Sequence, residues 1–240
     1  MANSGSEPLV QADNEIRGHL PEPPNDNDLA SRLLVSQVAS KLRDMIIQDH
    51  LKPGTRIRER QLSELLNVSR TPLREAIRIL VSERLVHSLP NRGAVVASPN
   101  MQEVRQLLEV LGTLEALGGQ LAAEFASNER IEEILALHHE MLSAFYRKDK
   151  LAYFKLNQAI HKSIVAAGGN GVLVDTHAQL NARLYRIRYI SNQRDDRWHE
   201  AVAQHEQIAD ALKARDAARL TTLMRDHIGH TWVKVNSVEA

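Results

Sequence analysis

The chain has 240 residues, of which 43% are hydrophobic, enough for one large domain or two domains of ordinary size. Its apolar runs are short, as in residues 131–137 with two Glu, whereas a bilayer span needs roughly 20 residues, so we expect no membrane segment. The start lacks a basic stretch followed by an apolar one, so it does not predict a secretory signal. The absence of cysteine excludes disulfides and thiolate metal sites and fits a cytoplasmic location.

The formal net charge of zero hides an uneven distribution. Residues 1–30 carry one Arg against six acidic residues, residues 31–99 carry 12 basic against six acidic residues, and residues 100–240 are close to neutral. A basic block can bind phosphates, although a modest excess is often only a solvated face. The charge pattern therefore leaves nucleic-acid binding open.

The N-terminal 30 residues contain four prolines and almost no periodic apolar pattern, so we predict a disordered tail over residues 1–30. Residues 31–98 predict a small helical domain. Its first helix is marked by apolar residues three and four positions apart and ends before Lys52-Pro53-Gly54. These residues are Leu34, Val38, Leu42, Met45 and Ile46.

Two more helices and a hairpin follow in this domain. Residues 59–66 predict a short helix with Leu62, Leu65 and Leu66 facing inward, and a third helix runs to Glu83. Two β-prone pieces then flank Pro90 to Gly93, which predicts a β-wing.

Residues 69–83 place their apolar side chains on one helical face, and the opposite face is polar and basic. Pro72 is acceptable in a first turn, which Ser69 or Thr71 can cap. Arg70, Thr71 and Arg74 then lie at the N-terminal end, where arginine can bond guanine in the major groove. Periodicity alone is also typical of an ordinary surface helix with solvated arginines.

The run LKPGTRIRERQLSELLNVSRTPLREAIRILVSERLVHSLPNRGAVVA, residues 51–97, resembles the winged helix-turn-helix of the GntR family of bacterial regulators. The proline-glycine turn, the Ser-Arg-Thr-Pro-x-Arg-Glu stretch and the wing glycine occur in the family's order. The resemblance implies that Gly93 lets the wing tip approach the minor groove. It also implies a set of residues that contact phosphates and bases, namely Arg60, Ser69, Arg70, Thr71 and Arg74.

Residues 99–240 read as helix almost throughout, with no strand pattern and no internal repeat. Breaks near residues 127–128, 148–149, 168–171, 192–196 and 215–216 divide this segment into six helices. The sequence therefore predicts a mainly α protein, in which a winged helix-turn-helix precedes an antiparallel six-helix bundle.

Three of the predicted helices each carry one histidine on an apolar face: His161, His205 and His227. A lone histidine on such a face is usually a core residue. Three such faces in one bundle favour convergence, because neutral imidazole is the commonest transition-metal ligand and burying three unpaired rings is costly.

Residues 101–236 resemble the effector-binding domain of the FadR-type branch of the GntR family, and six helices resemble its VanR-like subgroup. Landmarks are Leu114-Glu115, the His161 region ending in Gly169-Asn170, and His205-Glu206. The resemblance implies a divalent metal, expected to be zinc, nickel or manganese, held by a carboxylate and three histidines. A small organic acid, the effector, then docks on that metal.

His161, His205 and His227 fall on the family's histidine positions, but Asn157 stands where the family usually has Asp. An amide brings no charge, so weaker metal binding or a different metal is expected. Leu111-Gly112 also replaces an arginine that relatives often carry near the pocket. Arg188, on the predicted face of His177, is a candidate anchor for an anionic effector, although an ordinary surface arginine is an equally good interpretation.

The preferred interpretation is a homodimeric transcription regulator, a repressor rather than an enzyme. It would bind a palindromic DNA operator under the control of a small carboxylate metabolite. A metal-dependent enzyme is one alternative, but the histidines lack a neighbouring general base such as that of a HExxH helix. A second alternative is a helical domain that only dimerises, with inert core histidines.

Overall fold

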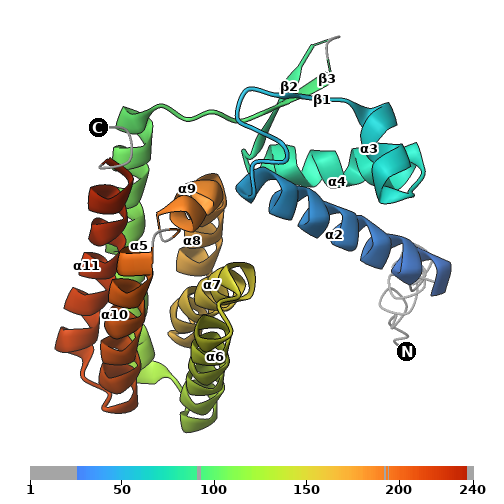
Figure 1. The fold of residues 1–240 in the computed structure, drawn as a ribbon. Coiled ribbons are helices and arrows are strands. Elements are labelled where there is room, and N and C mark those ends of the chain that lie inside the picture. The colour runs from blue at the N-terminus through green and yellow to red at the C-terminus, as the bar shows by residue number, and fades with distance from the viewer. Residues whose placement is uncertain (1–25, 91–92, 192, 194, 237–240) are drawn as a thin grey trace, which may run out of the picture.

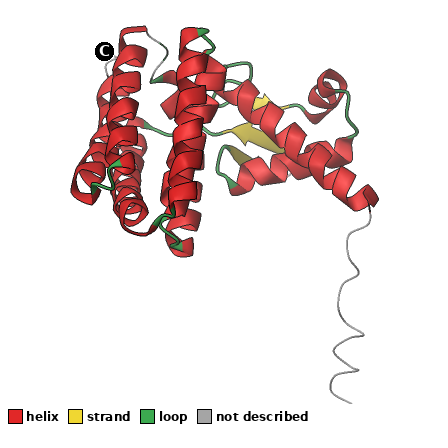
Figure 2. Ribbon diagram, turned by 90° about the horizontal axis from the view of Figure 1, so that it is seen from below, coloured by secondary structure: helices red, strands yellow, loops and turns green. Residues whose placement is uncertain are grey.

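In the computed structural model, residues 26–90, 93–191, 193 and 195–236 are described. They form a small N-terminal domain and a larger bundle of helices (Figure 1). The elements of the small domain are α2 (Asp26–Ile47), β1 (Arg56–Ile57), α3 (Glu59–Leu66), α4 (Arg70–Ser82), β2 (Val86–Leu89) and β3 (Gly93–Val96). Figure 2 shows this domain standing beside the bundle.

The small domain is a winged helix-turn-helix. Val38, Leu42 and Ile46 of α2 pack with the buried face of α4 in one apolar core. The wing is a three-stranded antiparallel sheet of order β1-β3-β2, in which β3 pairs with both neighbours. The predicted three helices and the wing are confirmed, whereas the two-residue strand β1 was too short to give a sequence pattern.

Three details differ from the sequence expectations. Residues 26–30, expected in the disordered tail, belong to α2, and the rest of that tail lies outside the described residues. Leu34 is 39% exposed and Leu65 is 68% exposed, although both were expected to face inward. Figure 1 shows the N-terminal part of α2 extending beyond the rest of the domain, and the eight-residue α3 buries only Leu62 fully.

The larger domain consists of α5 (Met101–Phe125), α6 (Asn128–Tyr146), α7 (Lys150–Ala167), α8 (Gly171–Arg183), α9 (Tyr185–Ile190), α10 (Asp195–Lys213) and α11 (Ala217–Asn236). The expected helical bundle is confirmed, but the predicted fourth helix is divided into α8 and α9. The break falls at Leu184, whose N–H contacts the carbonyl oxygens of both Leu180 and Asn181. The VanR-like subgroup, which was inferred from six helices, loses that support.

Two adjacent glycines bring α5 close to its neighbours. A Cβ on Gly118 would lie 2.8 Å from Val165 Cγ2 of α7, and one on Gly119 would lie 3.0 Å from Met224 Cγ of α11. Gly118 is about one turn beyond Glu115, while Val165 is about one turn beyond His161. The glycines therefore set the close packing that places Glu115 beside α7.

No helix among the described residues is both long and apolar enough to cross a membrane.

Candidate nucleic-acid interface and histidine centre

The recognition end of α4 is exposed, as predicted. The helix begins at Arg70 after Ser69, whose extended backbone makes it the N-cap without a side-chain cap bond. Leu73, Ala76, Ile77 and Leu80 are buried, so the predicted apolar face is confirmed. Arg70 and Thr71 are exposed, and within the described part of the chain the Arg70 side chain has no ion pair or hydrogen bond.

The two other predicted arginines form exposed ion pairs. Arg74 Nε on α4 donates to Glu59 Oε2 on α3 at 2.8 Å, and Arg60 Nε donates to Glu64 Oε1 at 3.1 Å. Exposed pairs of this kind contribute about 0–1 kcal/mol, so a DNA phosphate can replace the carboxylate at little cost. Both arginines therefore lie where a nucleic acid can reach them.

Strand β3 of the wing begins at the exposed Gly93, whose φ of +83° is a left-handed conformation that favours glycine. A Cβ there would lie 3.9 Å from Arg56 Nε. Arg56 thus adds a cation beside the wing that motif comparison missed, although it lies within the basic block of residues 31–99.

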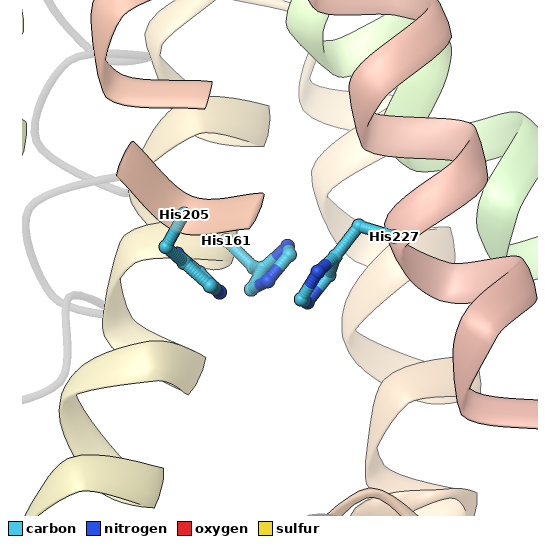
Figure 3. Close-up of side chains that lie close together, drawn as sticks. All are labelled: His161, His205 and His227. Atoms are coloured by element: carbon cyan, nitrogen blue, oxygen red, sulfur yellow. The ribbon is translucent and has the colours of Figure 1, made fainter. Parts of the chain in front are cut away.

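His161 of α7, His205 of α10 and His227 of α11 converge inside the helical domain (Figure 3). Each ring offers one nitrogen that lies within 4.8 Å of the others, and ring centroids are 4.7 to 5.1 Å apart. All three side chains are buried. The convergence expected from the three apolar faces is therefore found.

A buried carboxylate orients the first ring. His161 Nδ1 contacts Glu115 Oε2 of α5, and Glu115 is 0% exposed. A neutral ring that donates from Nδ1 leaves its Nε2 lone pair free. His161 Nε2 is itself buried and has no hydrogen-bond partner among the described residues. Glu115 is the group that sequence analysis named as a landmark but not as part of the site.

The other two rings have side-chain partners of their own. His227 Nδ1 is 2.8 Å from Gln204 Oε1, which fixes the ring so that Nε2 is the free nitrogen. His205 Nε2 is 2.6 Å from the side-chain amide of Asn157, and its Nδ1 is buried without a partner in the described chain. A half-turn of that amide would place Oδ1 of Asn157 beside the same nitrogen.

Both residues expected at the effector site reach Glu115. His177 Nε2 lies 3.2 Å from Glu115 Oε1, and Arg188 Nη1 donates to the same oxygen at 3.2 Å. The interpretation of Arg188 as a surface residue is wrong, because it is 4% exposed. The expectation that His177 and Arg188 share one helix is also wrong, because the break at Leu184 puts them on α8 and α9.

A chain of amides joins this carboxylate cluster to Asn157. Arg188 Nη1 donates to Asn181 Oδ1 at 2.6 Å, and Asn181 Nδ2 donates to Gln158 Oε1 at 2.8 Å. Gln158 Nε2 in turn lies 3.5 Å from Asn157 Oδ1. Sequence reasoning missed Gln158 and Asn181, because polar residues on a helix give no spacing signal unless their partners are known.

The protonation states follow from burial and charge. Burial alone would raise the pKa of Glu115, but His161, the Arg188 guanidinium and the ring N–H groups hold it well below its usual range. Burial, together with the neighbouring imidazoles, lowers the pKa of His205 and of His227 well below the ordinary histidine value. Burial also lowers the pKa of His161. At neutral pH the centre therefore combines neutral rings with one carboxylate and one guanidinium.

This donor set fits a divalent transition metal. Neutral imidazole nitrogens with an amide oxygen suit zinc or nickel, and the unpartnered Nε2 of His161 is a buried lone pair that a cation would satisfy. The His161–Glu115 contact is the carboxylate partner that metal-binding histidines commonly have. Manganese, which prefers oxygen ligands, fits less well because Asn157 is neutral.

Helix α9 touches both parts of the molecule. Arg188 faces the buried centre, whereas Tyr185 packs against the core of the winged domain. Arg186 Nη2 donates to Asp49 Oδ1 at 2.8 Å, just beyond α2. Burial raises the pKa of Tyr185 to about 12. One short helix therefore contacts the polar centre and the DNA-binding domain.

A winged helix-turn-helix joined to a helical bundle defines a DNA-binding transcription regulator. Residues 34–96 match the model for bacterial regulatory proteins of the gntR family, and residues 106–230 match the FCD domain. The chain belongs to the GntR family, in the FadR-type branch with its helical C-terminal domain. The resemblance seen in the sequence is confirmed.

Relatives support the same assignment. The chain is 30% identical over 195 residues to the HTH-type transcriptional repressor GlaR of Escherichia coli (strain K12), covering 78% of this chain and 89% of that protein. It is 28% identical over 192 residues to the repressor RspR of the same strain, covering 80% and 84%. These relatives and the family indicate a transcriptional regulator rather than an enzyme.

Solved structures share the fold. Escherichia coli McbR/YncC superposes with a TM-score of 0.74 at 21% identity, covering 86% of this chain and 99% of that chain. A GntR regulator from Rhodococcus sp. RHA1 gives a TM-score of 0.68 at 21% identity, covering 85% and 97%.

Proposed function

We propose that the protein is a transcriptional repressor whose operator affinity is controlled by a small carboxylate metabolite through a divalent metal in the histidine centre. The observation that carries the proposal is the meeting of three buried neutral imidazoles, one with an unpartnered Nε2, next to a buried arginine. The names of GlaR and RspR, both called repressors, support the direction of regulation.

Operator binding is assigned to the exposed N-terminal end of α4. An arginine that reads a guanine contributes about 1–3 kcal/mol, so Arg70→Ala should weaken binding to the operator by roughly 5- to 150-fold. A mobility-shift titration with DNA from upstream of the protein's own gene measures this. Lys213→Ala, an exposed cation at the end of α10, is the matched control and should bind like the native chain.

The metal is assigned to His161, His205 and His227, with the Asn157 amide as fourth donor. Bound there, a divalent cation would present a Lewis acid to which a carboxylate effector can coordinate. Elemental analysis of protein purified without added metal tests the assignment against His161→Ala. The exposed His139→Ala is the matched control and should keep the native metal content. Equal metal content in the native chain and His161→Ala would refute the site.

Arg188 is proposed to anchor the effector. Nη1 makes both of its hydrogen bonds within the described chain, which leaves its other guanidinium nitrogens for a carboxylate. Since Glu115 and His161 are fully buried, an arriving ligand must displace part of the wall around them. Helix α9 is the wall element that carries Arg188.

Displacement of α9 is the proposed link to DNA. A movement of Arg188 toward a ligand carries Tyr185 and Arg186 with it, because all three belong to one six-residue helix. Tyr185 packs against the core of the winged domain, so this movement changes how that domain is held against the bundle. Operator affinity would fall because two recognition helices must match the spacing of the two half-sites.

Tyr185→Ala tests this link, with Tyr189→Ala as the matched control. Both tyrosine rings make edge contacts with the Phe154 ring, with ring centroids 4.9 and 5.3 Å apart. Of the two, Tyr185 is the one that packs against the winged-domain core in the described structure. Mobility shifts are measured with and without zinc chloride plus citrate or another small di- or tricarboxylate. The ligand response should shrink in Tyr185→Ala and persist in Tyr189→Ala, and equal responses would contradict the link.

A homodimer is proposed to form through the outer side of α5 and α11. Val110 and Leu117 of α5 and Val233 of α11 are exposed apolar residues, 41 to 64% accessible. A two-fold symmetric dimer matches a palindromic operator. Val110→Glu should therefore shift sedimentation toward the monomer, while Val172→Glu on the exposed side of α8 should not.

A further inference from the structure

A cavity lies between the winged domain and the bundle, away from the histidine centre. It measures about 690 Å³ and is lined from both domains. Arg43 of α2 and Arg84, just after α4, contribute from the winged domain. Lys162 of α7, Gln179 of α8 and Tyr185 of α9 contribute from the bundle. The volume lies within the range of small-molecule sites.

The lining is positively charged. Arg43 is already paired with Glu83, through Nη2 to Oε1 at 2.6 Å and Nε to Oε2 at 2.8 Å. The side chains of Arg84 and Lys162 have neither an ion pair nor a hydrogen bond within the described residues. One acidic and three basic side chains give the cavity a net charge of +2. Two cations from different domains therefore face one space without an anionic partner.

We infer that this cavity binds a small organic polyanion, bearing carboxylate or phosphate groups, that bridges Lys162 and Arg84. Arginine can bind such a group with two parallel hydrogen bonds, and lysine adds a point charge. The Gln179 amide, which is exposed at the cavity, supplies a neutral donor. A ligand with separated anionic groups suits the volume better than a single inorganic ion.

This site is distinct from the histidine centre but shares its wall. Asn181 lines the cavity and also accepts a hydrogen bond from Arg188. On the other side, Ser82 at the end of α4 lines it, about 18 Å along the helix from Arg70. Figure 1 shows the C-terminal ends of α2 and α4 beside α9. A bridging anion would therefore fasten the winged domain to the bundle behind the recognition end of α4.

Isothermal titration calorimetry of the full chain tests the inference. The probes are citrate, glucose 6-phosphate and inorganic phosphate, with sodium chloride at matched ionic strength as the blank. Saturable binding of citrate or glucose 6-phosphate is expected, and it should weaken at least about tenfold in Lys162→Gln and in Arg84→Gln. The probe that binds identifies the anionic group as carboxylate or phosphate.

Three controls separate this site from others. Lys213→Gln removes an exposed lysine far along α10 and should bind like the native chain. Lys162→Gln should keep the native metal content and melting temperature, which shows that α7 is undisturbed. His161→Ala should keep anion binding, whatever happens to the metal. Absence of saturable binding, binding that survives both cavity substitutions, or binding lost only in His161→Ala would overturn the inference.

Discussion

Replacing Glu115 with glutamine should strongly destabilise the helical domain. The substitution keeps the shape of the side chain but removes the negative charge that His161, His177 and Arg188 share. Arg188, which is 4% exposed, then has only neutral oxygen acceptors within the described chain, the Asn181 oxygen and the amide oxygen of the new glutamine. A guanidinium is too basic to lose its proton under these conditions, so the charge stays buried and uncompensated.

The size of the effect follows from that isolated charge. Breaking a buried ion pair by removing one partner costs about 3–5 kcal/mol. The free energy of unfolding of a domain is about 5–15 kcal/mol, so Glu115→Gln should remove about a fifth of it or more. With a urea m-value of about 1–3 kcal/mol per M, the unfolding midpoint should fall by roughly 1–3 M or more.

Tryptophan fluorescence is the assay, because the chain has two tryptophans and both lie in the helical domain, Trp198 on α10 and Trp232 on α11. Metal-free protein is unfolded in urea at pH 7, where the lowered pKa of Glu115 keeps the carboxylate ionised. The native contribution of this depressed acid is present above its unfolded pKa of about 4.3 and is lost as the pH falls through its folded pKa.

Arg188→Met in the Glu115→Gln background distinguishes a buried charge from a general packing defect. Removing the isolated guanidinium should restore part of the lost stability, with a coupling energy of about 1–3 kcal/mol between the two positions. Leu111→Ala, which leaves a cavity on α5 near Glu115, is the control background. Adding Arg188→Met to Leu111→Ala should restore no stability. A cost below about 1 kcal/mol for Glu115→Gln, or additive effects in the double mutant, would refute the reasoning.

Three further predictions concern the same domain. Asn157→Asp should tighten zinc binding at least about tenfold in a competition titration, the size of effect that ligand-orienting partners already have; unchanged affinity would remove Asn157 from the site. In metal-free protein the pKa values of His205 and His227 are low in the folded state. Below about pH 6.5 these two rings therefore bind protons only in the unfolded chain. Stability should then fall by about 1.4 kcal/mol per pH unit for each ring, seen in urea midpoints between pH 7 and 5, and a flat profile would contradict this. Gly118→Ala should cost about 1–3 kcal/mol in the same assay because its Cβ would collide with α7, whereas Gly171→Ala, with open space, should be nearly neutral.

The winged domain could be predicted almost completely from the sequence, because its signals are local. The spacing from Leu73 to Leu80, a proline allowed only in a first turn and a glycine with positive φ each fix one element independently. The exceptions are the short β1, the early start of α2 at Asp26 and the exposed Leu34 and Leu65. A two-residue strand exists only through its pairing with β3, so periodicity gives no sign of β1.

The convergence of the three histidines was predicted from the sequence, but the place of Glu115 in the centre was not. Three apolar faces with one histidine each indicate convergence, but Glu115 also had a signal. Along α5 the buried positions Val104, Leu108, Leu111, Glu115 and Ala122 recur at heptad-like spacing, so an acid occupies a core position. The joint approach of His177 and Arg188 to that acid depends on the break at Leu184, which no glycine or proline announces.

The charges of the centre explain why metal and effector should depend on each other. In the described centre the fixed charges are the Glu115 carboxylate and the Arg188 guanidinium, which cancel. Because Asn157 is neutral, a divalent cation would enter with nearly its whole charge uncompensated, in an interior where that is costly. A dicarboxylate would supply the missing charge, and the cation together with Arg188 would hold the dicarboxylate. Binding linkage is reciprocal, so each should raise the affinity of the other by the same factor. With the neutral Asn157 in place of an acid, the proposed metal site would then be occupied only together with the metabolite, whereas an acid at this position would let the metal bind by itself.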